Sequence, residues 1–127
     1  MKVLAVDYGR ARTGVAVSDP TGTIARPVGV VERADAARIV ELIRQHEVDR
    51  VVVGMPLTLR GERGEQARET QAFIDALAAA TEVPVVAFDE RFTTDLAEQN
   101  PSAGADEDAR AAAHLLSSYL TWASARA

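Results

Sequence analysis

The stretch that decides the fold is residues 7–19, with the sequence DYGRARTGVAVSD. It follows an apolar run, residues 3–6, that is long enough for a buried strand and too short for a helix. Residues 14–17 predict a second strand, and glycines mark the turn between the two. Asp7 is therefore expected at the carboxyl end of a central strand, either as a turn residue or as an acid with a chemical role.

The composition predicts one α/β domain over residues 1–127. Hydrophobic residues make up 47% of the chain, enough for a packed core. The sequence has no cysteine, which excludes disulfides and thiolate metal sites. The first apolar run is too short for a signal peptide, and no apolar segment reaches the length of a membrane span. We expect a cytoplasmic protein that does not enter membranes.

The charge distribution leaves a polyanionic partner open. A net charge of −5 argues against a strongly basic nucleic-acid-binding protein. However, 13 of the 14 basic residues are arginine, and Arg10, Arg12 and Arg91 fall in or beside predicted loops. A guanidinium group matches the geometry of phosphate better than an ammonium group does. A general preference for arginine over lysine would give the same count, so only local geometry can decide between these explanations.

The order of predicted elements indicates a mixed sheet. Strands are expected at residues 2–7, 13–18 and 24–31, and their short glycine-bearing connections favour antiparallel neighbours. Asp35 can then cap a helix that ends near His46. Further strands are expected at residues 50–54 and 83–88, and loops at 55–64 and 100–105. Further helices are expected at 65–80, after Thr94, and at 106–123, the last with Tyr119 and Trp122 pointing inward. Helix-to-strand crossovers imply parallel pairing. The prediction is a five-stranded sheet, three antiparallel strands followed by parallel crossovers, with helices against its faces.

Carboxylates concentrate at three places in this predicted fold. Asp7 ends the first strand, Asp89 and Glu90 end the fifth, and residues 106–108 (DED) open the last helix. Side chains alternate faces along a strand, so only one of Asp89 and Glu90 is expected to face Asp7. Acids in a first helical turn also complement the helix dipole, which explains the third group without any chemistry.

Converging carboxylates would point to a metal ion. Two ionised groups about 6 Å apart repel by about 3 kcal/mol at an effective dielectric of ~20. A hard divalent cation such as Mg²⁺ removes that penalty because it takes oxygen ligands. A site with two such ions could activate water and neutralise a phosphodiester.

Other chemistries find less support. His46 and His114 lie far apart in the chain and fit packed or partly exposed helical positions. Ser18 and Thr94 have no evident histidine partner. Neither a phosphate-binding P-loop nor a dinucleotide-binding glycine motif occurs in the sequence.

Four ordered motifs carry a family resemblance over nearly the whole chain. They are DxGxxRxGVAxSD at residues 7–19, VVGMPL at 52–57 with Gly61 and Gly64, DERxTT at 89–94, and DxxAAxxLLxxYL at 108–120. Together they resemble the YqgF family of the ribonuclease H-like superfamily. That family is associated with pre-16S rRNA processing and with Holliday junction resolution.

The resemblance implies a ribonuclease H-like fold and a set of site residues. Asp7, Glu90 and Asp108 would be the catalytic carboxylates and would hold two Mg²⁺ or Mn²⁺ ions, with Asp7 bridging them. Arg12 and Arg91 would face substrate phosphates, with Arg10 beside them. Gly9 would let the substrate approach the backbone, although a role in the turn alone fits equally well. One departure is the segment 100–108, which is shorter than is common in the family and contains no basic residue.

The sequence thus predicts a metal-dependent endonuclease acting on structured RNA, in 5′-end processing of pre-16S rRNA within a pre-ribosomal particle. Three alternatives remain. The same chemistry could act on branched DNA, as in a Holliday junction resolvase. The fold could serve as a non-catalytic nucleic-acid-binding module. An ATPase of the actin–hexokinase type also places a phosphate loop after an early Asp-x-Gly, but such enzymes need two domains of this kind. The sequence does not give the oligomeric state.

Overall fold

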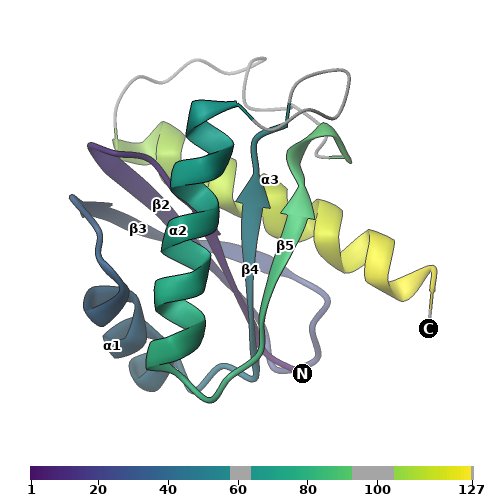
Figure 1. Ribbon diagram of the computed structural model, residues 1–127. Coiled ribbons are helices and arrows are strands. Elements are labelled where there is room, and N and C mark those ends of the chain that lie inside the picture. The colour runs from purple at the N-terminus through teal and green to yellow at the C-terminus, as the bar shows by residue number, and fades with distance from the viewer. Residues whose placement is uncertain (58–63, 93–104, 127) are drawn as a thin grey trace.

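A computed structural model of the chain describes residues 1–57, 64–92 and 105–126, with the side chains of residues 105 and 106 excepted. One mixed sheet runs in the order β3-β2-β1-β4-β5, with α1, α2 and α3 against its faces (Figure 1). The elements are β1 (Val3–Asp7), β2 (Arg12–Ser18), β3 (Ala25–Glu32), α1 (Ala36–His46), β4 (Arg50–Met55), α2 (Glu65–Ala80), β5 (Val85–Asp89), the single 3₁₀ turn η1 (Glu90–Phe92) and α3 (Ala105–Ser124).

The strand pairing places β1 at the centre of the sheet. β1 runs antiparallel to β2, with Asp7 opposite Gly14. On its other side it runs parallel to β4, with Val6 opposite Val53. β2 and β3 are antiparallel, and β4 and β5 are parallel. This is the predicted mixed five-stranded sheet, so the expected fold class is confirmed.

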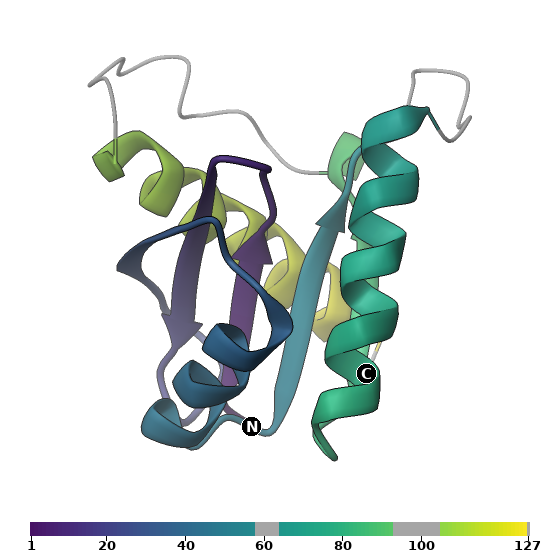
Figure 2. The same ribbon diagram turned by 60° about the vertical axis from the view of Figure 1, so that its left-hand side comes forward.

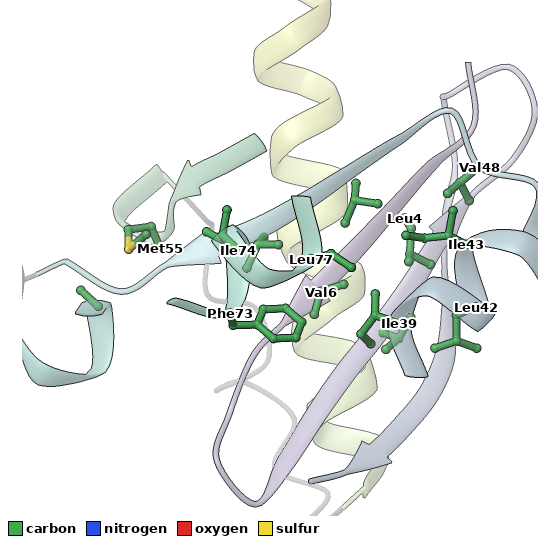
Figure 3. Close-up of a cluster of buried hydrophobic side chains, with 14 residues drawn as sticks. Leu4, Val6, Ile39, Leu42, Ile43, Val48, Met55, Phe73, Ile74 and Leu77 are labelled. Atoms are coloured by element: carbon green, nitrogen blue, oxygen red, sulfur yellow. The ribbon is translucent and has the colours of Figure 1, made fainter. Parts of the chain in front are cut away.

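The two faces of the sheet are covered by different helices. Along β1, Leu4 and Val6 belong to a core cluster with residues of α1 and α2, while Val3 and Ala5 pack with residues of α3. Figure 2 shows α1 and α2 on one side of the sheet and α3 on the other. Figure 3 shows the first cluster, in which side chains of α1 and α2 lie over the strands. The alternation along β1 therefore divides the molecule into two cores.

The helix boundaries follow from local chemistry. Asp35 caps α1 as predicted, because its Oδ1 accepts a hydrogen bond of 2.9 Å from the Arg38 amide. The helix ends at His46, where Glu47 adopts a left-handed conformation with φ 51°. The predicted bounds of 65–80 for α2 are also observed.

Two predictions needed correction. The fifth strand begins at Val85, two residues later than expected. Pro84 has no N–H group, and the Val83 amide donates to Thr81 Oγ1 instead of to a strand. We expected the tyrosine and tryptophan of α3 to point inward together. Tyr119 is buried, but Trp122 is 37% exposed and lies near the C-terminal end of α3, the part of the helix that extends past the sheet in Figure 1.

Some expectations lie outside the described residues. They are the short helix after Thr94 and most of the loops predicted at residues 55–64 and 100–105. Within the described part of the chain, no helix is long and apolar enough to cross a membrane.

Candidate active site

Asp7 lies on the face of the sheet that α3 covers. It ends β1 two residues after Ala5, which packs in the α3 core, so strand alternation gives both side chains the same face. Its neighbours across the sheet have no side chain: Gly14 stands opposite on β2, and Gly54 follows the β4 residue that pairs with Val6. The Asp7 carboxylate therefore has no side chain beside it on either neighbouring strand.

Glu90 reaches Asp7 across Gly54. The strand β5 ends at Asp89, and η1 turns the next side chain back over the sheet. A Cβ atom on Gly54 would lie 2.7 Å from Glu90 Oε1 and 3.0 Å from Glu90 Cγ. Gly54 thus forms the seat for this side chain, and a hydrogen bond joins the Glu90 and Asp7 carboxyl groups.

Asp89 does not join this pair. Its Oδ1 accepts hydrogen bonds from the Arg91 amide at 2.9 Å and from Arg91 Nε at 3.0 Å. The choice between Asp89 and Glu90 that strand alternation left open is therefore made by geometry, and Glu90 is the residue that faces Asp7.

Asp108 approaches from the second layer, in the first turns of α3. The α3 backbone passes so close to β2 that a Cβ atom on Gly14 would lie 2.6 Å from the Asp108 carbonyl carbon. Real Cβ atoms essentially never come this close to another heavy atom. The absence of a side chain at position 14 is thus what allows Asp108 to approach Asp7, and the Asp108 charge acts on Asp7.

The electrostatics of the three carboxylates favour a shared proton. Burial raises the pKa of Asp7, the hydrogen bond from Glu90 opposes that rise, and the charge of Asp108 adds to it. Burial also raises the pKa of Glu90 to about 7, helped by the neighbouring Asp7 charge. We infer that below about pH 7 Glu90 is protonated and its O–H group donates a hydrogen bond to the Asp7 carboxylate. Two negative charges therefore do not lie side by side.

One carboxylate oxygen at this site is buried without a hydrogen bond. Asp108 Oδ2 lies 2.9 Å from Arg12 Nε, an ion pair by distance. Yet within the described structure Oδ2 has no hydrogen-bond partner, because the N–H group is not aligned with it. The two charges remain paired, but the hydrogen bond is lost, since hydrogen-bond strength falls steeply with angle. A buried acceptor in this state costs free energy until a donor or a cation satisfies it.

These features fit a hard divalent cation. All three side chains offer oxygen ligands, one shares a proton that a cation would replace, and one has an orphaned oxygen. Among the described residues, however, no three acidic or histidine side chains already form a group that could hold a metal ion. Asp7 and Glu90 bond to each other, and Asp108 turns toward Arg12. The oxygen ligands for a cation are present, but they are not arranged as a metal-binding site.

The arginines predicted to contact phosphate are each held by a carboxylate. Arg10 Nε donates to Glu69 Oε2 at 2.8 Å, and its Nη2 lies 3.1 Å from Glu65 Oε1. Arg91 pairs with Asp89, and Arg12 lies beside Asp108. All three guanidinium groups are partly exposed.

Gly9 closes the turn between β1 and β2. Its amide donates to Thr13 Oγ1, and a Cβ atom at position 9 would lie 2.5 Å from the Arg12 carbonyl oxygen. This geometry supports a role in the turn itself, one of the two roles that the sequence left open.

Sequence reasoning missed Gly14 and Gly54 as parts of the site. The signal was available for Gly54, because a glycine inside an apolar strand marks a close approach of another group. It could not say which group approaches, since Glu90 lies far along the chain. Gly14 was expected to begin the second strand and to mark the turn before it. It does lie within β2, but its contact with α3 was not predicted.

The fold and this site define a class of protein. The architecture is similar to that of RuvC from T. thermophilus, described in complex with a Holliday junction substrate, with a TM-score of 0.63 at 20% identity over 97% of this chain and 96% of that one. A second structure of Thermus thermophilus RuvC gives the same TM-score at 16% identity. The fold is therefore a RuvC-like ribonuclease H fold, here with Asp7 at the end of its central strand.

Within that class, residues 1–122 match the family model described as "RuvX: Holliday junction resolvase", and the chain belongs to this family. A relative from Chloroflexus aurantiacus, named "Putative pre-16S rRNA nuclease", is 50% identical over an alignment of 102 positions that covers 76% of this chain and 66% of that protein. An Anaeromyxobacter protein of the same name is 43% identical over 94% of this chain and 96% of its own length. The matched stretch thus covers just under two thirds of the first relative and nearly all of the second. The resemblance read from the four motifs is confirmed.

Proposed function

We propose that this protein is a metal-dependent endonuclease that hydrolyses phosphodiester bonds in structured RNA, and that it processes the 5′ end of pre-16S rRNA. The observation that carries the proposal is the convergence of Asp7, Glu90 and Asp108 from β1, η1 and α3 onto one face of the sheet. Gathering three partly buried acids costs stability, and a catalytic cation would compensate for it. The names of the relatives supply the RNA substrate.

In this proposal the chain's own residues divide the work. Asp7, Glu90 and Asp108 would hold two Mg²⁺ or Mn²⁺ ions. Such ions supply an activated water and neutralise the charge that develops on the phosphate. Arg12 and Arg91 would bind the phosphates of the cleaved strand, with Arg10 and Gly9 at its edge. Substrate phosphates would have to compete with the carboxylates that these arginines now contact.

The alternative substrate is branched DNA. The family description and the RuvC fold favour it, and phosphodiester hydrolysis at a metal site does not need to read the ribose 2′-hydroxyl. Purified protein should therefore be given a pre-16S RNA fragment and a four-way DNA junction side by side, with Mg²⁺ or Mn²⁺. Faster cleavage of the RNA supports the proposal, and cleavage of the junction alone replaces it with the alternative. No cleavage of either substrate contradicts an enzymatic role.

Three variants test the assigned carboxylates. We expect Asp7→Asn, Glu90→Gln and Asp108→Asn each to lower the cleavage rate by at least about 100-fold while RNA binding is retained, because one metal ligand is lost. Asp75→Asn is the matched control, an exposed acid on α2 whose hydrogen bond from Gln71 an amide can still accept. If the three variants cleave at the wild-type rate, these carboxylates are not the catalytic residues.

Metal binding can be measured without turnover. A cation that binds only the folded state raises the melting temperature by mass action. Mn²⁺ or Mg²⁺ should raise the Tm of the wild type and of Asp75→Asn, and should raise that of Asp7→Asn much less. An unchanged wild-type Tm at millimolar concentrations of both ions would contradict the assigned metal site.

A further inference from the structure

A concave surface lies beside the candidate active site. It is a groove of about 420 Å³ lined by residues of β5, η1 and α3, together with Arg50 of β4. Its lining includes Phe88, Phe92, Tyr119, Trp122 and Arg50. We call this the aromatic groove. None of these residues was assigned a role by the family motifs or by the proposed chemistry.

The aromatic groove exposes ring surfaces to solvent that a core would bury. Phe88 is buried and forms its floor, with ring centroids 5.7 Å from Trp122 and 6.1 Å from Phe92. Phe92 is 61% exposed and Trp122 is 37% exposed, which places them among the large apolar side chains most open to solvent. Two exposed rings around a shared aromatic floor offer flat surfaces to a ligand, and exposed clusters of this kind mark interaction sites.

The groove also carries unused hydrogen-bonding capacity and positive charge. Arg50 Nη1 donates to the Tyr119 hydroxyl at 3.0 Å. Its Nε is buried and, in the described part of the chain, has no hydrogen-bond partner. The Arg126 guanidinium lies 4.3 Å from the Trp122 ring centroid. The ligand is therefore expected to be planar, to carry hydrogen-bond acceptors and to be negatively charged or attached to an anion.

The groove adjoins the turn η1 that carries Glu90. Phe92 closes the same 3₁₀ turn that begins with Glu90, and Asp89 contributes to the groove lining. A strand whose phosphate lies at Glu90 would therefore bring a neighbouring nucleotide to Phe92. Bases stack on exposed aromatic side chains whatever their identity, because every base has a π face.

We propose that the aromatic groove binds an unpaired nucleobase next to the cleaved bond, stacked on Phe92 and bordered by Trp122. This inference rests on the proposed nuclease function and adds a substrate requirement to it. The strand must be single-stranded at the nucleotide that enters the groove, because a base inside a duplex has no free face to stack. Cleavage would then be directed to the edges of RNA helices rather than to their interiors.

The only tryptophan of the chain provides a direct measurement. A single-stranded RNA oligonucleotide should quench Trp122 fluorescence when it is added to metal-free wild-type protein, in which cleavage cannot occur. An oligonucleotide with the same backbone but without bases should quench much less. Equal quenching by both would overturn the proposal, because phosphates alone would then explain binding.

Substitutions at Phe92 separate stacking from apolar contact. Phe92→Leu keeps the apolar bulk and loses the π face, so we expect a roughly five- to tenfold higher Kd for the oligonucleotide. Phe92→Tyr should stay within about twofold of the wild type, because it keeps the ring. Ile24→Ala is the control, an exposed apolar side chain at the start of β3, outside the groove. A wild-type Kd for Phe92→Leu would overturn the proposal.

The remaining outcomes distinguish this proposal from the nuclease proposal. Base-dependent quenching without any cleavage activity would leave the groove assignment standing and remove the proposed function. Cleavage of RNA without quenching would support the proposed function and overturn the groove assignment. If Trp122 fluorescence changes with protein concentration alone, the groove is a contact between copies of the chain, and the nucleobase proposal is wrong.

Discussion

The two faces of the sheet use the same strands for opposite purposes. On the α1 and α2 face, Leu4, Val6 and Leu77 are fully buried in a continuous apolar layer. On the α3 face, the ends of the strands carry Asp7 and the glycines that admit Glu90 and Asp108. Val6 and Asp7 are adjacent residues, and strand alternation alone separates a core position from a charged one. Apolar packing on the α1 and α2 face stabilises the fold. The carboxylates gathered on the α3 face lower that stability.

The largest expected effect tests whether the apolar face supports the site only through stability. Leu77→Ala removes a fully buried side chain of α2 and should lower the free energy of unfolding by about 2–5 kcal/mol. Because Leu77 packs in the core cluster on the α1 and α2 face, the fraction that remains folded should cleave RNA at the wild-type rate. Urea denaturation and a cleavage assay normalised to folded protein check both expectations. A large drop in the normalised rate would show that the two faces are coupled.

The next effect addresses the close approach on the other face. Gly14→Ala places a Cβ atom against the Asp108 backbone, which cannot move as a flexible side chain could. We expect a loss of about 2–3 kcal/mol in unfolding free energy, together with a loss of cleavage because α3 is pushed away from Asp7. Gly64→Ser is the control, since a Cβ atom there meets nothing within 4 Å and serine suits the start of α2. A Gly14→Ala protein with wild-type stability would contradict the described packing of α3.

The smallest expected effect is a pH dependence confined to the α3 face. The pKa of Glu90 is raised to about 7 from its ordinary value of 4.5, so between these pH values the folded state holds a proton that the unfolded state has lost. The stability of the metal-free protein should therefore fall as the pH rises through this window. After allowance for partial exposure we expect a change of about 1–2 kcal/mol between pH 5 and pH 8.

Glu90→Gln isolates this contribution because an amide does not titrate. Its unfolding free energy should vary less between pH 5 and pH 8 than that of the wild type, as measured by denaturation at each pH. The groups with lowered pKa values, Asp19 and Asp89, act in the opposite direction and at lower pH, so they cancel in the comparison. Parallel curves for the two proteins would mean that Glu90 is ionised throughout.

Much of the framework could be predicted because it depends on local signals. The cap at Asp35, the bounds of α2 and the antiparallel order of the first three strands all follow from residues close together in sequence. Asp7 could be singled out because a carboxylate directly after a buried strand is conspicuous. Strand alternation predicted that only one of Asp89 and Glu90 faces Asp7. It could not say which, since that depends on the turn η1 that follows β5.

The rest depends on contacts between distant elements. The seat that Gly54 provides exists only once β5 lies beside β4, and the role of Gly14 only once α3 crosses β2. The aromatic groove depends on α3 extending past β5, which placed Trp122 outside the core where an inward position had been predicted. Helical periodicity describes which residues share a face, but it does not say where the sheet beneath that face ends.

The contact between Gly14 and Asp108 has a consequence for sequence evolution. The α3 backbone rests on the surface of β2 at Asp108, and this contact restrains the position of the carboxylate. Any residue larger than glycine at position 14 would displace α3 at Asp108, so the strand and the helix cannot vary independently at this point. The departure of this chain from its family, the segment 100–108, ends at the residue that this contact restrains.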